Sequence, residues 1–132
     1  MKLKLGYKEM VRRAEAEIKT IDVAEAMRLL SADAAVFVDL RDIRELYREG
    51  KIPKAKHVPR GMLEFWIDPD SPYHKPFFLE KQKIVFYCNL GWRSALASQL
   101  AQQMGLEDVC HMAGGFDAWK AAGGAVEPVE KR

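Results

Sequence analysis

The sequence has few cysteines, no long apolar run and no large excess of charge of either sign. Only two cysteines, Cys88 and Cys110, occur in 132 residues, too few for the disulfide framework of a small secreted protein. No apolar run approaches the roughly 18–20 residues that cross a membrane, and the charged segment 1–13 lacks the apolar core of a signal peptide. These absences predict a cytoplasmic protein that has no membrane partner.

The charge and histidine content exclude two further kinds of function. The 21 Lys and Arg residues against 19 Asp and Glu residues give a formal net charge of +2, whereas a nucleic-acid-binding domain carries a concentrated basic surface. The three histidines, His57, His74 and His111, are widely spaced and form no zinc-ligand pattern. We therefore expect no nucleic-acid partner and no metal, and we assign no catalytic role to these histidines.

Strand and helix patterns alternate along the chain. Residues 35–38 and 84–87 are short continuous apolar runs, which are typical of strands buried on both faces. Further strands are expected at residues 18–21, 55–58 and 109–112. Apolar residues at helical spacing predict helices at residues 7–17, 23–30, 42–48, 95–104 and 116–122.

This order of elements predicts an α/β fold with a mostly parallel central sheet and helices on both faces. We place the domain at residues 18–127. An extra N-terminal helix forms an extension at residues 1–17, and a polar tail follows at residues 128–132.

Residues 60–80 are the least regular part of the sequence. Three prolines, Pro69, Pro72 and Pro76, prevent a long helix there. The aromatic residues of segment 65–78 are expected to pack onto the body of the domain. Whether Arg60 or this segment lines a pocket is left open.

Cys88 directly follows the apolar strand 84–87 and begins a short loop that leads into a helix. In open parallel sheets, ligands bind beyond the carboxyl ends of the strands, which is where this cysteine is expected. A tight loop before a helix presents several N–H groups, and the helix N-terminus adds partial positive charge. Gly91 permits a backbone conformation that other residues resist. Such a loop binds an anion and would stabilise Cys88 as a nucleophilic thiolate.

The loop sequence Cys88-Asn-Leu-Gly-Trp-Arg-Ser94 closely resembles the active-site loop of the rhodanese-like sulfurtransferases. Val38-Asp-Leu-Arg41, Glu45, Gly50-Lys-Ile-Pro-Lys-Ala55 and Val58-Pro59 resemble the first motif of this family. Gly114-Gly-Phe-Asp-Ala-Trp119, followed by Gly123, resembles its closing motif. The three motifs occur in the family's order and together cover residues 18–127.

The resemblance implies a rhodanese-like fold and a ping-pong sulfur transfer. Cys88 is the implied catalytic residue, which takes sulfane sulfur from a small anionic donor such as thiosulfate and passes it to a thiophilic acceptor. The implied substrate-binding residues, whose N–H groups would hold the persulfide, are Asn89, Leu90, Gly91, Trp92, Arg93 and Ser94. Arg93 would hold the donor or orient the loop. The resemblance implies no cofactor, and the acceptor could be another protein.

Two alternative functions are considered beside this one. The first alternative is a cysteine-dependent phosphatase or arsenate reductase, which also has an anion-binding loop that begins with cysteine and ends with arginine. Such phosphatases have five residues between the cysteine and the arginine, whereas this chain has four, at 89–92. The shorter loop favours a single sulfur atom over a tetrahedral oxyanion. The second alternative is a persulfide carrier or protein-interaction module that does not turn over with small acceptors.

The remaining residues of the motifs have structural expectations. Asp39 and Arg41 are expected to form structural ion pairs near the base of the loop, with Glu45 as a partner of Arg41. Cys110 lies within an apolar strand and is expected to be an inert core thiol. Phe116 and Trp119 are expected to anchor the terminal helix.

Overall fold

The computed structural model describes all residues, 1–132, and its centre is a five-stranded parallel sheet. The strands lie in the order β1-β5-β4-β2-β3, and every pairing is parallel. They are β1 (Lys19–Ile21), β2 (Val36–Asp39), β3 (Lys56–His57), β4 (Ile84–Tyr87) and β5 (Val109–Met112). The parallel α/β fold predicted from the order of elements is confirmed.

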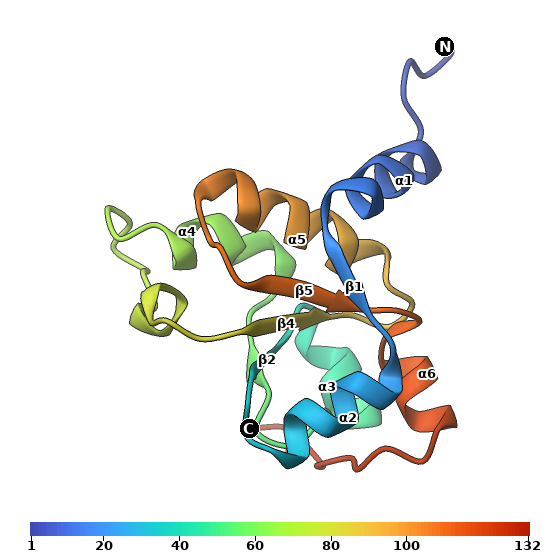
Figure 1. The fold of residues 1–132 in the computed structure, drawn as a ribbon, viewed down its shortest axis with the longest axis vertical. Coiled ribbons are helices and arrows are strands. Elements are labelled where there is room, and N and C mark those ends of the chain that lie inside the picture. Colours follow the sequence, from blue (N-terminus) through green and yellow to red (C-terminus); the bar gives the residue numbers. More distant parts are fainter.

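Six α-helices cover the two faces of this sheet. They are α1 (Tyr7–Glu17), α2 (Val23–Ser31), α3 (Ile43–Glu49), α4 (Leu63–Ile67), α5 (Trp92–Met104) and α6 (Gly115–Ala121). Figure 1 shows α1, α4 and α5 above the sheet and α2, α3 and α6 below it. None of these helices has both the length and the hydropathy needed to cross a lipid bilayer.

Strand β4 is buried on both faces because its side chains alternate between two cores. Val85 and Tyr87 belong to the cluster that α2 and α6 cover, whereas Ile84 and Phe86 belong to the cluster that α4 and α5 cover. All four residues of the strand are buried. The alternation of side chains along a strand therefore places Cys88, two residues after Phe86, on the α5 side of the sheet.

Helix α5 packs closely on the sheet because its buried face consists of small residues. These are Ser94, Ala95, Ala97, Ser98 and Ala101. The predicted N-terminal helix lies against α5, where Val11 and Ala14 form a small core cluster with Ala95. Helix α1 is thus packed onto the domain at the element that follows the cysteine loop.

The segment from residue 60 to residue 80 contains one short helix, α4, between two 3₁₀ turns, Arg60–Met62 and Pro76–Leu79. Its aromatic residues only partly pack as expected. Trp66 and Phe77 lie against the core cluster of α4 and α5, but Phe65 and Tyr73 are exposed. Arg60 forms a partly exposed ion pair with Glu64, one turn along the chain.

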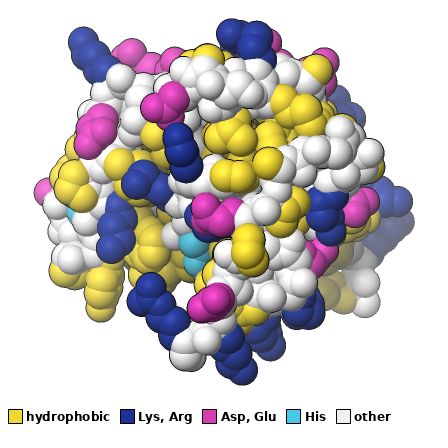
Figure 2. Space-filling view, turned by 90° about the horizontal axis from the view of Figure 1, so that it is seen from below, with side chains coloured by type: hydrophobic (Ala, Val, Ile, Leu, Met, Phe, Trp, Pro, Cys, Tyr) yellow, Lys and Arg dark blue, Asp and Glu magenta, His cyan; other side chains and the backbone are white.

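Charged side chains of both signs are interspersed on the surface. Figure 2 shows the face of the molecule that lies at the bottom of Figure 1, where Lys and Arg side chains lie among Asp and Glu side chains around hydrophobic patches. The mixed charge of the sequence thus also appears as a mixed distribution on this face.

Candidate active site

Cys88 lies at the carboxyl edge of the sheet, directly after β4, and only 1% of its surface is exposed. In Figure 1 the carboxyl end of β5 points to the right, where α5 begins and the chain turns down into α6. The Gly91 N–H donates a hydrogen bond to Cys88 Sγ at 3.2 Å, and Ser94 Oγ lies 3.7 Å from the same sulfur. The loop therefore turns the sulfur toward the N-terminus of α5.

This turn depends on Gly91. The residue caps the N-terminus of α5 with a φ of 106°, in the left-handed region that residues with a Cβ rarely adopt. Its conformation directs its own N–H back to the sulfur while the next residue enters the helix. Glycine at this position is thus required by the backbone of the cysteine loop.

Most backbone N–H groups of the loop have no hydrogen-bond partner. Five of its N–H groups find no acceptor within the chain, those of Asn89, Leu90, Trp92, Arg93 and Ser94. The last three belong to the first turn of α5, whose N–H groups have no intrahelical partner and carry partial positive charge. Together they form an electropositive end of a helix beside the sulfur of Cys88.

Helix α6 fixes the loop from behind. The Phe116 N–H donates to the Cys88 carbonyl at 2.7 Å, and the Asp117 N–H donates to the Asn89 carbonyl at 3.1 Å. A Cβ at Gly115 would lie 2.5 Å from both carbonyl oxygens, so only glycine allows this close approach. The closing motif of the sequence therefore acts by holding the backbone of the cysteine loop.

Arg93 is bound to a carboxylate, which corrects one prediction. Its guanidinium donates two hydrogen bonds to Glu45, at 2.8 and 3.1 Å, so the partner of Glu45 is Arg93 and not Arg41. The hydrogen bond to Arg93 lowers the pKa of Glu45. The pKa of Arg93 is raised, mainly by Glu45 and further by the nearby Cys88. Glu45 thus sets the orientation of the Arg93 guanidinium at the start of α5.

Arg41 instead forms the predicted structural ion pair beneath the loop. Arg41 and Asp39 are both fully buried and joined by hydrogen bonds of 2.7 to 3.2 Å. Arg41 also donates to the Gly50 carbonyl at 2.7 Å, and its guanidinium carbon lies 4.3 Å from the centre of the Phe116 ring. The pair connects the end of β2 to the residue after α3 and to α6.

His111, to which no catalytic role is assigned from the sequence, lies at the site. His111 Nδ1 lies 3.0 Å from Ser94 Oγ, and the side chain is buried on β5. Burial lowers its pKa to about 4. The alternation of side chains along a strand is the signal that could have identified it. If Cys110 faces one side of the sheet, His111 faces the other side, where the helix that carries Ser94 packs.

The two cysteines differ in their surroundings. Cys110 is fully buried, and burial raises the pKa of its thiol to about 11. The Cys110 thiol lies 3.7 Å from the Ile84 carbonyl and belongs to the core that α2 and α6 cover. It lies in the core as predicted, so Cys88 is the one of the two cysteines that faces the N-terminus of α5.

The outer rim of the loop is apolar. Leu90 and Trp92 are each half exposed, and the Trp92 ring lies 5.0 Å from the ring of Tyr7, between ring centres. Tyr7 comes from α1, so the N-terminal helix supplies part of this rim. The six predicted substrate-binding residues thus have different positions. Gly91 and Ser94 contact the sulfur directly, Arg93 is held by Glu45, and Asn89 is held by Asp117 through its carbonyl. The side chains of Leu90 and Trp92 are half exposed.

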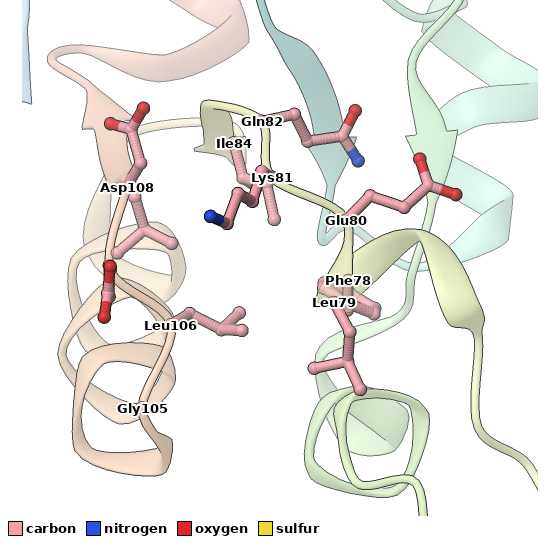
Figure 3. A pocket seen from close by; sticks show the side chains of 11 residues that line it. Phe78, Leu79, Glu80, Lys81, Gln82, Ile84, Gly105, Leu106 and Asp108 are labelled. Atoms are coloured by element: carbon pink, nitrogen blue, oxygen red, sulfur yellow. The ribbon is translucent and has the colours of Figure 1, made fainter.

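A separate pocket of about 570 Å³ lies elsewhere. Figure 3 shows Leu106 and Asp108 on one side of it and Leu79 and Glu80 on the other. Its lining includes Ile84, the first residue of β4, so it lies at the opposite end of the strand from Cys88. It contains neither cysteine. No group of three or more His, Cys, Asp or Glu side chains is placed to hold a metal ion.

The fold and the site define a class of protein: a parallel α/β domain with a buried cysteine loop at a helix N-terminus. Comparison with known sequences gives the family. The model of the rhodanese-like domain matches residues 22–122, and the chain therefore belongs to the rhodanese family. It is an enzyme of the sulfurtransferase class.

Two curated relatives illustrate this. The chain is 32% identical to thiosulfate sulfurtransferase GlpE of Pseudoalteromonas translucida over 107 residues, which cover 79% of this chain and 90% of that protein. It is 29% identical to human thiosulfate:glutathione sulfurtransferase over 106 residues, which cover 76% of this chain and 91% of that protein.

Among solved structures, one from Rhodopseudomonas palustris is 51% identical and superposes with a TM-score of 0.94. The match covers 96% of this chain and 98% of that one. That protein is described as one of unknown function and a possible tyrosine phosphatase. The match therefore extends the similarity to residues outside 22–122.

Proposed function

We propose that this enzyme transfers sulfane sulfur from a small anionic donor such as thiosulfate to a thiophilic acceptor through a persulfide on Cys88. The observation that carries the proposal is the sulfur of Cys88 facing the N-terminus of α5, with the Gly91 N–H bonded to it. The names of the two curated sulfurtransferases support the same reaction.

In the first half-reaction, the Cys88 thiolate attacks the outer sulfur of thiosulfate. A new S–S bond forms at Cys88, the S–S bond of the donor breaks, and sulfite leaves with the electron pair. In the second half-reaction, the acceptor attacks the outer sulfur and Cys88 leaves as the thiolate. No external oxidant or reductant is consumed.

The free N–H groups of the loop are suited to both anions in this cycle. A persulfide extends the charge one sulfur beyond Cys88, toward the N–H groups of Trp92, Arg93 and Ser94. Hydrogen bonds to a charged acceptor are roughly twice as strong as neutral ones. Arg93, oriented by Glu45, adds a positive charge for the sulfonate end of the donor.

A phosphatase is the second candidate, because the 51% identical structure is described as a possible one. Four residues separate Cys88 from Arg93, and the arginine is already paired with Glu45. The short loop favours a sulfur atom over a tetrahedral phosphate. We therefore place sulfur transfer first, and hydrolysis of p-nitrophenyl phosphate measures the alternative directly.

The test is thiocyanate formation from thiosulfate and cyanide. We expect the wild type and Cys110→Ser to turn over and Cys88→Ser to be inactive, because Cys110 is buried away from the site. Cys110→Ser is the matched control, since it removes the other thiol of the chain. Phosphatase activity without thiocyanate formation would contradict the proposal.

The acceptor is tested by measuring the sulfite released from thiosulfate when other acceptors replace cyanide. The human relative is named for glutathione, and the exposed Leu90 and Trp92 give the mouth of the site an apolar rim that suits an acceptor larger than cyanide. We expect glutathione or a protein thiol to replace cyanide. A persulfide that forms but passes to none of these acceptors would favour the carrier alternative.

A further inference from the structure

One buried contact at the site has no role in the reaction described so far. His111 Nδ1 lies 3.0 Å from Ser94 Oγ, and the same hydroxyl lies 3.7 Å from Cys88 Sγ. All three side chains are buried, with at most 2% of any residue exposed. The second ring nitrogen of His111, Nε2, has no hydrogen-bond partner. The three groups form a line from the core to the nucleophile.

The fold places these groups together. In β5, Val109 belongs to the core that α5 covers, and alternation puts His111 on the same side. Cys88 is on this side as well, two residues after Phe86, which pairs in register with His111. Ser94 faces both from the buried side of α5.

The protonation of His111 decides what Ser94 can do. A neutral imidazole has one N–H donor and one acceptor nitrogen. If Nδ1 accepted the Ser94 proton, the hydroxyl would present only lone pairs to the sulfur, and these would repel a thiolate. If Nδ1 carries the proton and donates to Ser94 Oγ, the hydroxyl proton is free to point at Cys88. An anionic sulfur therefore selects the second arrangement.

We propose that His111 is a positioning residue, which donates from Nδ1 to Ser94 Oγ and so directs the Ser94 hydroxyl proton to the sulfur of Cys88. The proposal rests on the proposed function, because it gives Ser94 a role toward the thiolate and the persulfide. It adds a residue from a different strand, outside the cysteine loop.

The surroundings keep His111 neutral while the enzyme works. Burial is the cause that lowers its pKa to about 4, and no ion-pair partner contacts it. The ionisable group that it faces is Cys88, through Ser94, and the next charged side chain on α5 is Arg93. The imidazole thus acts as a fixed dipole at neutral pH, and it does not serve as a proton carrier.

Two amide substitutions separate the two ring nitrogens. The amide nitrogen of Asn takes the place of Nδ1, whereas that of Gln takes the place of Nε2. We expect His111→Gln to slow persulfide formation from thiosulfate about tenfold, as for the loss of one hydrogen bond to a charged group. We expect His111→Asn to retain the wild-type rate within about threefold.

The pH dependence of Cys88 alkylation by iodoacetamide distinguishes this role from a role in packing alone, because packing alone would not change the pH at which alkylation is half-maximal. In a Cys110→Ser background, Cys88 is the only thiol that can be alkylated. His111→Gln should shift the midpoint of alkylation upward by about one pH unit, because a hydrogen bond to the thiolate is lost, whereas His111→Asn should leave it unchanged. This measurement needs no sulfur donor, so it tests the proposal even if sulfur transfer itself is not observed.

A double-mutant cycle tests whether His111 acts through Ser94. In a Ser94→Ala background, His111→Gln should cause no further loss of rate and no further shift in the alkylation midpoint. Equal effects with and without Ser94 would overturn the proposal. So would a His111→Asn variant that is folded, by its thermal unfolding, but as impaired as His111→Gln.

Discussion

The close approach of α6 to the cysteine loop predicts that Gly115→Ala damages both stability and activity. Gly115 has a φ of +61°, and an added Cβ would lie 2.5 Å from the carbonyl oxygens of Cys88 and Asn89. The left-handed conformation costs a residue with a Cβ about 1–2 kcal/mol. The overlap with the backbone adds about 1–3 kcal/mol, as for other overpacked sites. Together these lower the free energy of unfolding by about 2–5 kcal/mol.

Activity should fall further than stability alone explains. The carbonyl oxygens have to move, and they belong to the loop that aims the sulfur. A displacement of about 1 Å in a catalytic group can cost about a hundredfold in rate. We expect thiocyanate formation to fall by about this factor at a temperature where the variant is still folded.

Gly123→Ala is the matched control for this experiment. Gly123 also has a positive φ, of +79°, but an added Cβ would meet nothing within 4 Å. This variant should lose only the 1–2 kcal/mol of backbone strain and should keep its activity. Urea unfolding and the thiocyanate assay measure both quantities. Equal stability and equal activity of Gly115→Ala and Gly123→Ala would show that the close approach of α6 does not hold the cysteine loop.

Three further predictions concern contacts around the site. Asp39→Asn should lower the free energy of unfolding by about 3 kcal/mol in urea titration, because it removes the buried carboxylate of the pair and leaves the Arg41 guanidinium only the partly exposed Glu49, 3.8 Å away. Since the hydrogen bond to Arg93 lowers the pKa of Glu45, the stability that this pair adds is present above about pH 4.5 and lost as the pH falls through the lowered pKa. Wild type should therefore lose stability relative to Glu45→Gln in urea titrations between pH 5 and pH 3, and parallel curves would contradict the pairing. Tyr7→Ala should cost about 0.5–1.5 kcal/mol of stability through the lost ring contact with Trp92, and Tyr7→Phe should cost almost nothing.

The fold could be predicted from the sequence because its strands are distinct. The runs at 35–38 and 84–87 consist of apolar and aromatic residues, so both faces of the sheet that contains them must be covered. A parallel sheet between two layers of helices provides this cover. The cysteine loop could be located because it directly follows one of these runs. Local sequence thus determines where the cysteine of the candidate site lies.

The contacts between side chains could not be predicted in the same way. Proximity in sequence favours a pair of Glu45 with Arg41, but Arg41 is held by Asp39 in the core, and Glu45 pairs with Arg93 instead. Which pair forms depends on how α3 sits beside α5, and hydrophobic patterns do not specify this. The contact of His111 with Ser94 likewise depends on the packing of α5 over β5. A histidine in a short strand has no sequence signature of such a contact.

The intact mass of the protein after reaction with thiosulfate shows whether Cys88 carries sulfur as a persulfide. We expect a gain of one sulfur atom in the wild type and in Cys110→Ser, its loss when cyanide is added, and no gain in Cys88→Ser. An unchanged mass in the wild type, or a sulfur adduct on Cys88→Ser, would contradict the proposed persulfide on Cys88.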